Sequence, residues 1–289
     1  MPLIRKQNYS SAQAPKKADE GKLWATCAGC GAAIYHATLD ENWQVCADCG
    51  HHYPLSAPRR VGLLVDPDTF VETDAGLESV DTLGFGAALY TDRLTAAREA
   101  TGMNDAVLCG TATLAGRPLA LGVMDCRFMD GSLGSVIGEK IARLAELATQ
   151  KGLPLVLITA SSGARIQEGA LGLMQMAKTA GALGRHRHAG LLTVVILTHP
   201  TSGTVLASFA SLGDVILAEP GARIGFTGPR ALRRAAGNAL PPGIQTAEFL
   251  LEHGFIDRVV PRPRQRQELG LLLEYFSGAV RCHAPAVGV

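Results

Sequence analysis

Four cysteines near the N-terminus constrain the fold of this chain more than any other feature. From Cys27 to Cys49 the sequence reads C-x-x-C, fifteen intervening residues, then C-x-x-C. Two such pairs at this spacing supply four thiolates for one tetrahedral zinc ion. Glycine follows each pair, at Gly31 and Gly50, where the backbone can turn tightly. We therefore predict a structural zinc ribbon with the ligands Cys27, Cys30, Cys46 and Cys49.

The zinc site predicted here is a closed one. Four sulfurs complete the coordination sphere and leave no open position for a substrate, so this zinc should hold structure rather than do chemistry. His51 and His52 are then surface or supporting groups and not ligands. The alternative, a pair of redox dithiols, lacks a thioredoxin-like βαβ context. Between the pairs we expect two short strands around a polar turn.

Composition excludes several classes of protein. The chain has 289 residues, of which 47% are hydrophobic and 18% charged, enough for a sizeable core. A net charge of +1 gives no global field for nucleic acid or an anionic membrane. No apolar run approaches the roughly 20 residues of a membrane span. The first residues lack an apolar signal core, so we expect a cytoplasmic protein without a disulfide framework.

The rest of the chain alternates between strands and helices. A short helix should start after Ser56, residues 66–90 are turn-rich, and 90–102 read as a helix. From Asp105 onward the pattern predicts a hairpin at 107–125, a helix at 134–151, a buried strand at 153–160 and a second long helix at 168–187. Strands at 190–198, 215–220 and 222–227 and helices at 247–253 and 264–277 should follow. Repeated β–β–α units predict a layered α/β domain. The expected division is 1–22 flexible tail, 23–53 ribbon, 54–280 main domain and 281–289 tail.

Three stretches rich in Gly, Ser and Thr stand out, at 127–140, 158–169 and 197–208. Each is expected to follow a buried strand and open a helix. Such ends present unpaired backbone N–H groups and the positive pole of the helix dipole, which suit an anion or a carbonyl oxygen that gains charge. Ordinary tight turns are the alternative for any one of them.

Other catalytic signatures are missing. The chain has no G-x-S-x-G elbow, no Walker A loop and no G-x-G-x-x-G after a first strand. Most histidines lie in polar contexts, and His199, at the end of a predicted buried strand, is the exception. The chain also lacks a Met-Lys-Met biotin attachment motif, so any biotin must come on another chain.

Ordered motifs along the chain resemble the beta subunit of bacterial acetyl-CoA carboxylase carboxyltransferase. They are CAGC…CADCGHH, FMDGSLGSVIGEKI, SSGARIQEGALGLMQMAKT, LASFASLGDVILAEPGARIGFTGPR and EFLLEHGFIDRVV, and the likeness runs from about residue 23 to about 277. It implies a crotonase-like fold of ββα spiral units and a homologous alpha subunit in an α2β2 assembly. It also implies transfer of carboxylate from carboxybiotin, on a separate biotin carrier protein, to the CoA thioester acetyl-CoA, giving malonyl-CoA.

The resemblance also assigns site residues. The backbone N–H groups of Ser162 and Gly163 would form an oxyanion hole for the enolate of the thioester. The remaining substrate-binding positions implied by the family motifs are Gly131, Ser132, Ala164, Arg165, Gly203 and Thr204.

This sequence departs from the family motifs at three glycines, which are Asp130, Ser162 and Thr204 here, and an acid has become His199. A side chain at positive φ costs on the order of 1 kcal/mol. These departures motivate a second hypothesis, a divergent paralogue that catalyses decarboxylation or acyl transfer on another acyl thioester. A third, nucleic-acid binding through the ribbon and Arg230, Arg233 and Arg234, is disfavoured by the nearly neutral charge.

Overall fold

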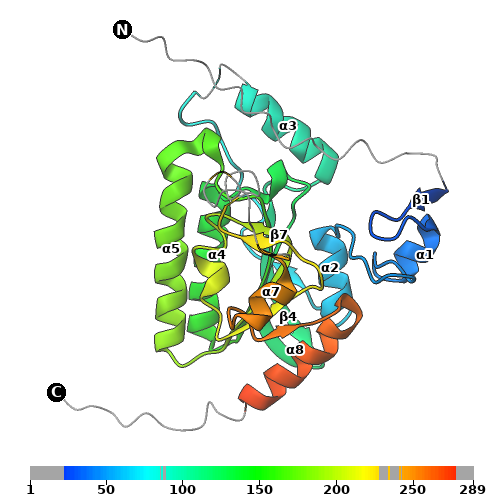
Figure 1. Ribbon diagram of the computed structural model, residues 1–289. Coiled ribbons are helices and arrows are strands. Elements are labelled where there is room, and N and C mark those ends of the chain that lie inside the picture. Colours follow the sequence, from blue (N-terminus) through cyan, green and yellow to red (C-terminus); the bar gives the residue numbers. More distant parts are fainter. Residues whose placement is uncertain are drawn as a thin grey trace.

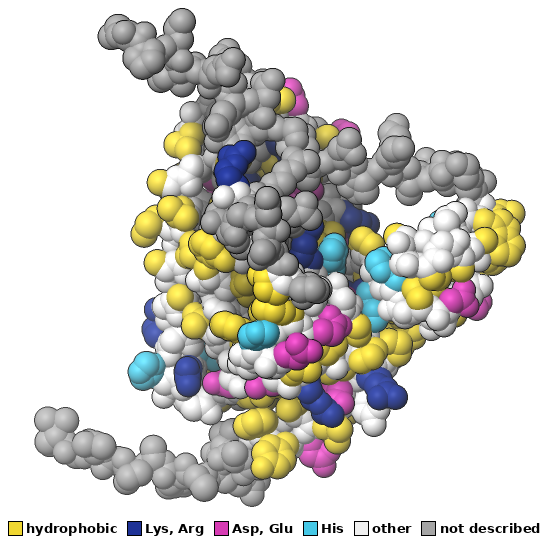
Figure 2. Space-filling model, in the orientation of Figure 1, with side chains coloured by type: hydrophobic (Ala, Val, Ile, Leu, Met, Phe, Trp, Pro, Cys, Tyr) yellow, Lys and Arg dark blue, Asp and Glu magenta, His cyan; other side chains and the backbone are white. Residues whose placement is uncertain are grey.

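The computed structural model describes residues 23–84, 86, 89–227, 234, 241 and 243–277. The two predicted tails, Cys282, Arg230 and Arg233 lie outside these ranges, whereas Arg234 is exposed. The described chain forms a small N-terminal ribbon and a larger layered domain, and the ribbon stands at one side of that domain (Figures 1 and 2).

The ribbon has its own small core. Strands β1 (Trp24–Thr26) and β2 (Ala33–Tyr35) pair antiparallel, and helix α1 (His36–Glu41) follows directly. Buried side chains of this unit cluster separately from the main core; they are Cys27, Ile34, Leu39 and Cys46. The prediction of two strands between the cysteine pairs is wrong. The segment after β2 is a short polar helix, α1, in which Leu39 is the one buried residue. The strand that pairs with β2 is β1, which precedes Cys27.

One mixed sheet organises the main domain. Its strand order is β10-β8-β7-β6-β5-β4-β3, and β9 pairs with β7. Strands β3, β4 and β5 pair antiparallel, while β5, β6, β7, β8 and β10 are parallel. Their bounds are β3 Val71–Glu72, β4 Val107–Leu114, β5 Arg117–Met124, β6 Leu155–Ser161, β7 Thr193–Ser202, β8 Val215–Ala218, β9 Ile224–Gly225 and β10 Arg258–Val259.

Helices cover both faces of this sheet (Figure 1). Helices α4 and α5 lie on one side, and α2 and α8 on the other. Helix α4 reaches the sheet where Leu144 lies against Gly122, and α5 approaches α4 where Gln175 lies against Gly138. The helices are α2 Ala57–Leu64, α3 Leu89–Thr101, α4 Ser135–Lys151, α5 Gly169–His188, α7 Ala247–Glu252 and α8 Arg262–Ser277. These bounds match the predicted helices to within about two residues. None of the described helices is both long and apolar enough to cross a membrane.

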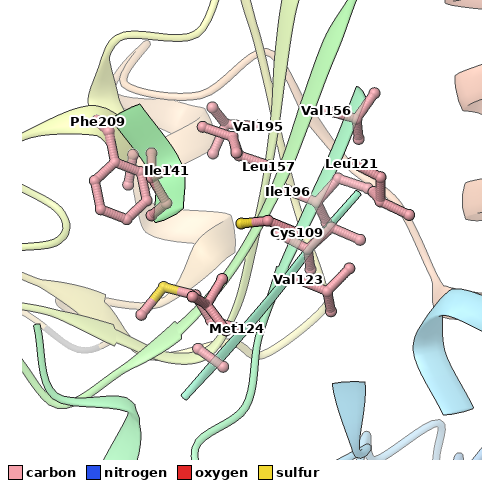
Figure 3. Packing of buried hydrophobic residues seen from close by; sticks show 14 of the residues in the cluster. Cys109, Leu121, Val123, Met124, Ile141, Val156, Leu157, Val195, Ile196 and Phe209 are labelled. Atoms are coloured by element: carbon pink, nitrogen blue, oxygen red, sulfur yellow. The ribbon is translucent and has the colours of Figure 1, made fainter. Parts of the chain in front are cut away.

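The core lies between the sheet and its helices (Figure 3). Val123, Leu157 and Ile196 come from three adjacent strands, and each is at most 1% exposed. Because β5, β6 and β7 are parallel, their carboxyl ends lie at the same edge of the sheet. Ligand sites of open parallel sheets form at this edge. The fold therefore brings the three Gly/Ser/Thr-rich stretches together.

The third of these stretches differs from its prediction. The first two precede α4 and α5 through short 3-10 turns, η1 (Met129–Gly131) and η2 (Ile166–Glu168). The third opens no helix of this kind, because Thr201 and Ser202 still pair with β9. The chain then turns at Gly203, where φ is +60°, and reaches only a 3-10 turn, η3 (Phe209–Ser211).

Candidate functional site

The four ribbon cysteines form a site that fits zinc. Their Sγ atoms all lie within 4.8 Å of one another. The separation is 3.6 Å between Cys27 and Cys49, and 4.0 Å between Cys30 and Cys46. Tetrahedral coordination with Zn–S bonds of about 2.3 Å places sulfurs about 3.8 Å apart. The Tyr53 hydroxyl lowers the pKa of the Cys27 thiol to about 5, which favours the thiolate that binds metal.

Both cysteine pairs fold in the same way. Cys27 N–H donates to the Ala32 carbonyl at 2.7 Å, and Cys46 N–H donates to the His51 carbonyl at 2.9 Å. The glycine after each pair closes a second bond to the carbonyl of the first cysteine, also at 2.9 Å. Both glycines have φ above +70°, where a side chain is strained. The repeated geometry explains why glycine follows each C-x-x-C.

A buried arginine joins the ribbon to the main domain. The Arg262 guanidinium donates to the carbonyl oxygens of Trp43, at 2.8 Å, and Tyr53, at 3.0 Å. Its other N–H groups reach both carboxylate oxygens of Glu219, at 2.8 and 2.9 Å. Arg60 binds the same carboxylate at 2.8 Å. We call Arg60, Glu219, Arg262 and Gln265 the docking cluster; every member is at most 4% exposed.

The docking cluster contains two cations, Arg60 and Arg262, and one anion, Glu219. Burial alone would raise the pKa of the Glu219 carboxyl, but the guanidinium groups of Arg60 and Arg262 hold it well below its usual range. Both cations therefore depend on one carboxylate for compensation. The ring of His52 accepts the Arg262 backbone N–H at 3.1 Å, so a residue next to the metal site also contacts this joint.

Two turns meet at the carboxyl edge of the sheet and define the candidate active site. A Cβ built on Gly203, after β7, would lie 3.1 Å from the Cα of Gly163, after β6. Gly163 has a φ of +120° and Gly203 a φ of +60°, so both positions favour glycine for conformation, and Gly203 also for space. At Gly131 any Cβ would collide with the Ala160 carbonyl, which packs η1 directly onto the end of β6. The predicted residues Gly131, Gly163 and Gly203 are thus brought together.

The expected oxyanion donors are engaged within the chain. Ser162 N–H donates to the Asp130 carbonyl at 3.0 Å, and Gly163 N–H donates to Ser161 Oγ at 3.1 Å. Among the described residues, the N–H groups of Ala164 and Thr204 have no acceptor. Ala164 and Thr204 border the same junction as the predicted donors Ser162 and Gly163.

The departures from the family glycines also separate into two kinds. Asp130 has a φ of +58° and a ψ of 24°, in the left-handed region that Asp tolerates better than most residues. Ser162 and Thr204 are absent from the residues with positive φ. Strain at these two positions, expected from the sequence, does not occur.

Arg165 takes a structural place rather than a place in the pocket. Its guanidinium is fully buried and makes two bonds to Asp105, at 2.6 and 2.9 Å. Burial would lower the pKa of Arg165, yet its bonds to Asp105 raise it, so the cation persists. Its Nε also donates to Ser132 Oγ at 3.3 Å, and that hydroxyl donates to the Met129 carbonyl. The side chains of Arg165 and Ser132 therefore form a brace that joins the loops after β5 and β6 from the interior of the domain.

Glu168 extends this brace to two helices. One oxygen accepts the Tyr90 hydroxyl of α3 at 2.8 Å, and the other accepts the backbone N–H of Ser135 at the start of α4. Sequence reasoning missed Asp105, Tyr90 and Glu168. Asp105 is 60 residues from Arg165, and Tyr90 is 78 residues from Glu168, so no local spacing signals these pairs.

His199 lies away from the Gly163 junction. Its Nδ1 accepts the Arg223 backbone N–H at 3.2 Å, and burial, Arg223 and His51 lower its pKa, which favours the neutral ring. The ribbon residues His52 and Tyr53 line the same small hollow. His199 therefore belongs to the contact between the ribbon and the main domain.

Comparisons with known proteins agree with this geometry. Residues 56–242 match the carboxyl transferase domain, and residues 24–49 match the acetyl-CoA carboxylase zinc finger domain. The acetyl-coenzyme A carboxylase carboxyl transferase subunit beta of Synechococcus sp. (strain JA-3-3Ab) is 52% identical over 92% of this chain and 85% of its own length. That of Gloeobacter violaceus (strain ATCC 29082 / PCC 7421) is 49% identical over 98% of this chain and 93% of its own.

This chain belongs to the family of acetyl-CoA carboxylase carboxyltransferase beta subunits. Its zinc ribbon and crotonase-like domain are those of the family, as the sequence motifs indicated. Solved structures share the fold. Transcarboxylase 12S with hydrolysed methylmalonyl-coenzyme A has a TM-score of 0.67 and 26% identity, over 76% of this chain and 41% of that one. A Pseudomonas malonate decarboxylase hetero-dimer has a TM-score of 0.59 and 25% identity, over 78% of this chain and 86% of that one.

Proposed function

We propose that this beta subunit binds acetyl-CoA and presents its methyl carbon for carboxylation, giving malonyl-CoA. The observation that carries the proposal is the junction of Gly163 and Gly203, beside which Ala164 and Thr204 offer N–H groups without acceptors among the described residues. The junction lies at the carboxyl edge of a parallel sheet, where ligands of α/β domains bind. The beta-subunit relatives, about half identical over most of their length, support the same reaction.

The chemical problem is an enolate. Removing a proton from a thioester methyl moves negative charge to the acyl oxygen. Fixed backbone N–H donors in a site that excludes water stabilise that charge by several kcal/mol, without any reorganisation during the reaction. We assign this role to Ala164 and Thr204. Gly203 keeps the two turns close, because a Cβ there would lie 3.1 Å from the Gly163 Cα, and Gly163 is favoured by its φ of +120°.

The brace below the site holds these donors in place. Arg165 and Asp105 pair at 2.6 Å in the interior, and Arg165 N–H donates to the Leu133 carbonyl at 2.9 Å. The Arg165 backbone bond joins the loops after β5 and β6. Oxyanion donors are effective only when their direction is fixed before the reaction begins.

The carboxyl group comes from outside this chain. Biotin on a separate carrier protein supplies the carboxyl group and, once that group leaves, a basic nitrogen. This source explains why no side-chain base is found at the Gly163 junction among the described residues. His199, within β7, lines a hollow with the ribbon residues His52 and Tyr53 instead.

An exposed apolar surface beside the site suits the homologous alpha subunit. Ile166, Leu173 and Met174 are 69%, 54% and 61% exposed, and Leu171 adds to them. Leu83 joins the same surface, since its side chain lies against Gly169 at the start of α5. Hydrophobic side chains gather along α5 in Figure 2. Large apolar patches on a surface mark sites of protein association, and we propose an α2β2 assembly in the cytoplasm that uses this one.

The test of the proposed function is direct synthesis. The chain, co-purified with its alpha-type partner and loaded with zinc, is given acetyl-CoA and carboxybiotin, and malonyl-CoA is measured. The proposal expects malonyl-CoA at a rate that saturates with acetyl-CoA. An intact, zinc-loaded assembly that makes no malonyl-CoA contradicts it.

The alternative of a repurposed paralogue loses its main argument. It was motivated by side chains at three family glycines, yet Ser162 and Thr204 do not have positive φ. Asp130 alone takes the left-handed conformation. Two of the three altered positions therefore carry no strained side chain.

A further inference from the structure

A cavity of about 690 Å³ opens at the amino edge of the parallel strands, opposite the candidate active site. Pro154, Leu192 and Asp214 lie directly before β6, β7 and β8 and line its wall. Helix α8 contributes Leu273 and Phe276. The C-terminal ends of α5 and α8 both lie toward the bottom of Figure 1 and border the cavity. Its volume falls within the range of about 300–1,000 Å³ found for pockets that bind small ligands.

Most of the cavity wall is apolar. Leu191 and Leu273 are buried within it, whereas Leu153, Leu192 and Phe276 are half-buried and keep part of their surface open to the cavity. Leucine and phenylalanine side chains offer no hydrogen bonds, so this wall suits a hydrocarbon chain. Covering it with such a chain removes apolar area from water, which favours binding.

The charged side chains of the wall are not balanced in the same way. Asp214, the single carboxylate among the described residues that line the cavity, accepts the Thr193 N–H at 2.9 Å and lies 3.8 Å from Arg187. The Arg117 guanidinium instead lies 3.7 Å from Glu274, which stands outside the wall and is 64% exposed. Exposed pairs of this length are weak. Arg117 can therefore bind a ligand carboxylate, which fits a guanidinium through two parallel hydrogen bonds.

The ends of two helices determine where a charged group fits best. Helices α4 and α5 end beside the cavity, and the C-terminal end of a helix carries partial negative charge. The N–H groups of Leu153 and Gly190 bond carbonyls in the last turns of these helices, at 2.8 and 2.9 Å. The negative potential that remains disfavours an anion between the helix ends. A carboxylate is therefore better placed beside Arg117, with its chain directed inward.

We propose that this cavity binds an amphipathic carboxylate with a single unbranched hydrocarbon chain. The chain packs against Leu192, Leu273 and Phe276, and the carboxylate binds the Arg117 guanidinium. The apolar wall selects against small polar anions, and the charge of Arg117 selects against cations of the same shape. The site lies at the other edge of the sheet from the Gly163 junction, so the inference does not rest on the proposed function.

The test is isothermal titration calorimetry of the zinc-loaded full chain at pH 7, with dodecanoate below its micelle concentration. Butanoate keeps the carboxylate and shortens the chain, whereas dodecyltrimethylammonium keeps the chain and reverses the charge. We expect dodecanoate to bind at least about tenfold more tightly than either probe, since each probe lacks one of the two interactions. Dodecanoate that binds no more tightly than either probe overturns the inference.

Two pairs of variants locate the bound ligand. Arg117→Gln should weaken dodecanoate binding about tenfold, the scale for a lost hydrogen bond to a charged group. Arg185→Gln, which changes an exposed arginine of α5 outside the wall, should leave binding unchanged. Phe276→Ala should weaken binding about fivefold through lost apolar contact. Leu271→Ala, at an exposed position of α8 outside the wall, should not.

Three outcomes of the variant experiment matter. Equal or absent losses within either pair of variants place the binding elsewhere and overturn the inference. A changed oligomeric state of Phe276→Ala, with dodecanoate binding intact, would identify the cavity as an interface between copies and also overturn it. Because the Arg117–Glu274 pair is exposed, Arg117→Gln should shift Tm by less than about 3 °C, so a selective loss of binding reports the site. None of these measurements uses turnover, so their failure is distinct from failure of the proposed carboxyl transfer.

Discussion

The docking cluster predicts the effect of one uncharged substitution. Glu219→Gln keeps the shape of the side chain but removes the charge that two buried arginines share. The carboxylate is 1% exposed and accepts four hydrogen bonds, from Arg60, Gln265 and two nitrogens of Arg262. Removing one partner of a buried ion pair costs about 3–5 kcal/mol. A chain of this size loses roughly 2–3 °C of Tm per kcal/mol, so we expect a fall of about 6–15 °C.

The assay is thermal unfolding of the zinc-loaded chain at pH 7, with Glu268→Gln as the matched control. Glu268 also pairs with an arginine, Arg258, at 2.7 Å, but that arginine is exposed. Such surface pairs contribute at most about 1 kcal/mol. A change below 2 °C for Glu219→Gln, or an equal change in both variants, refutes the reasoning.

The pH dependence of the same variant provides an independent check. The folded-state pKa of Glu219 is depressed, so its contribution is present above the unfolded pKa of about 4.3 and is lost as pH falls toward the folded value. The stability gap between the unsubstituted chain and Glu219→Gln should therefore narrow below about pH 4. A gap that widens on acidification contradicts the assigned charge state.

Three further predictions concern the ribbon, the site loop and the exposed patch. Cys46→Ser removes one of four zinc ligands, so metal analysis should find less than one zinc per chain, and hydrogen exchange should show lost protection in residues 24–53 while the main sheet stays protected. Ser162→Gly should shift Tm by less than about 3 °C in thermal unfolding, because Ser162 does not have positive φ; a clear rise would reveal strain. Met174→Asp should block co-purification with the alpha subunit without lowering Tm, whereas Glu146→Gln, on an exposed part of α4, should not; association that survives Met174→Asp moves the interface elsewhere.

Local signals were enough to predict the ribbon ligands and the helices. Zinc needs four sulfurs at fixed spacing, so Cys27 to Cys49 could be interpreted without any tertiary knowledge. Long amphipathic segments such as 134–151 carry a period of 3.6 residues that survives in the fold. The short ribbon helix was missed because six residues hold less than two turns of that pattern.

Long-range polar contacts could not be predicted in the same way. Arg262 meets the carbonyls of Trp43 and Tyr53 across more than 200 residues. Nothing local distinguishes it from the neighbouring exposed arginine, Arg264. The hydrogen-bond state of the predicted oxyanion donors could not be predicted for a related reason. Sequence motifs identify the turn at Ser162, but which N–H groups are already bonded depends on Asp130 and Ser161 in three dimensions.

The most direct test of the central claim is the biotin dependence of the reverse reaction. The zinc-loaded alpha–beta complex is given malonyl-CoA with and without free biotin, and acetyl-CoA release is followed. Carboxyl transfer needs an acceptor, so the account predicts release with biotin and almost none without it. Release at the same rate without biotin would show decarboxylation and contradict the assignment as a carboxyltransferase beta subunit.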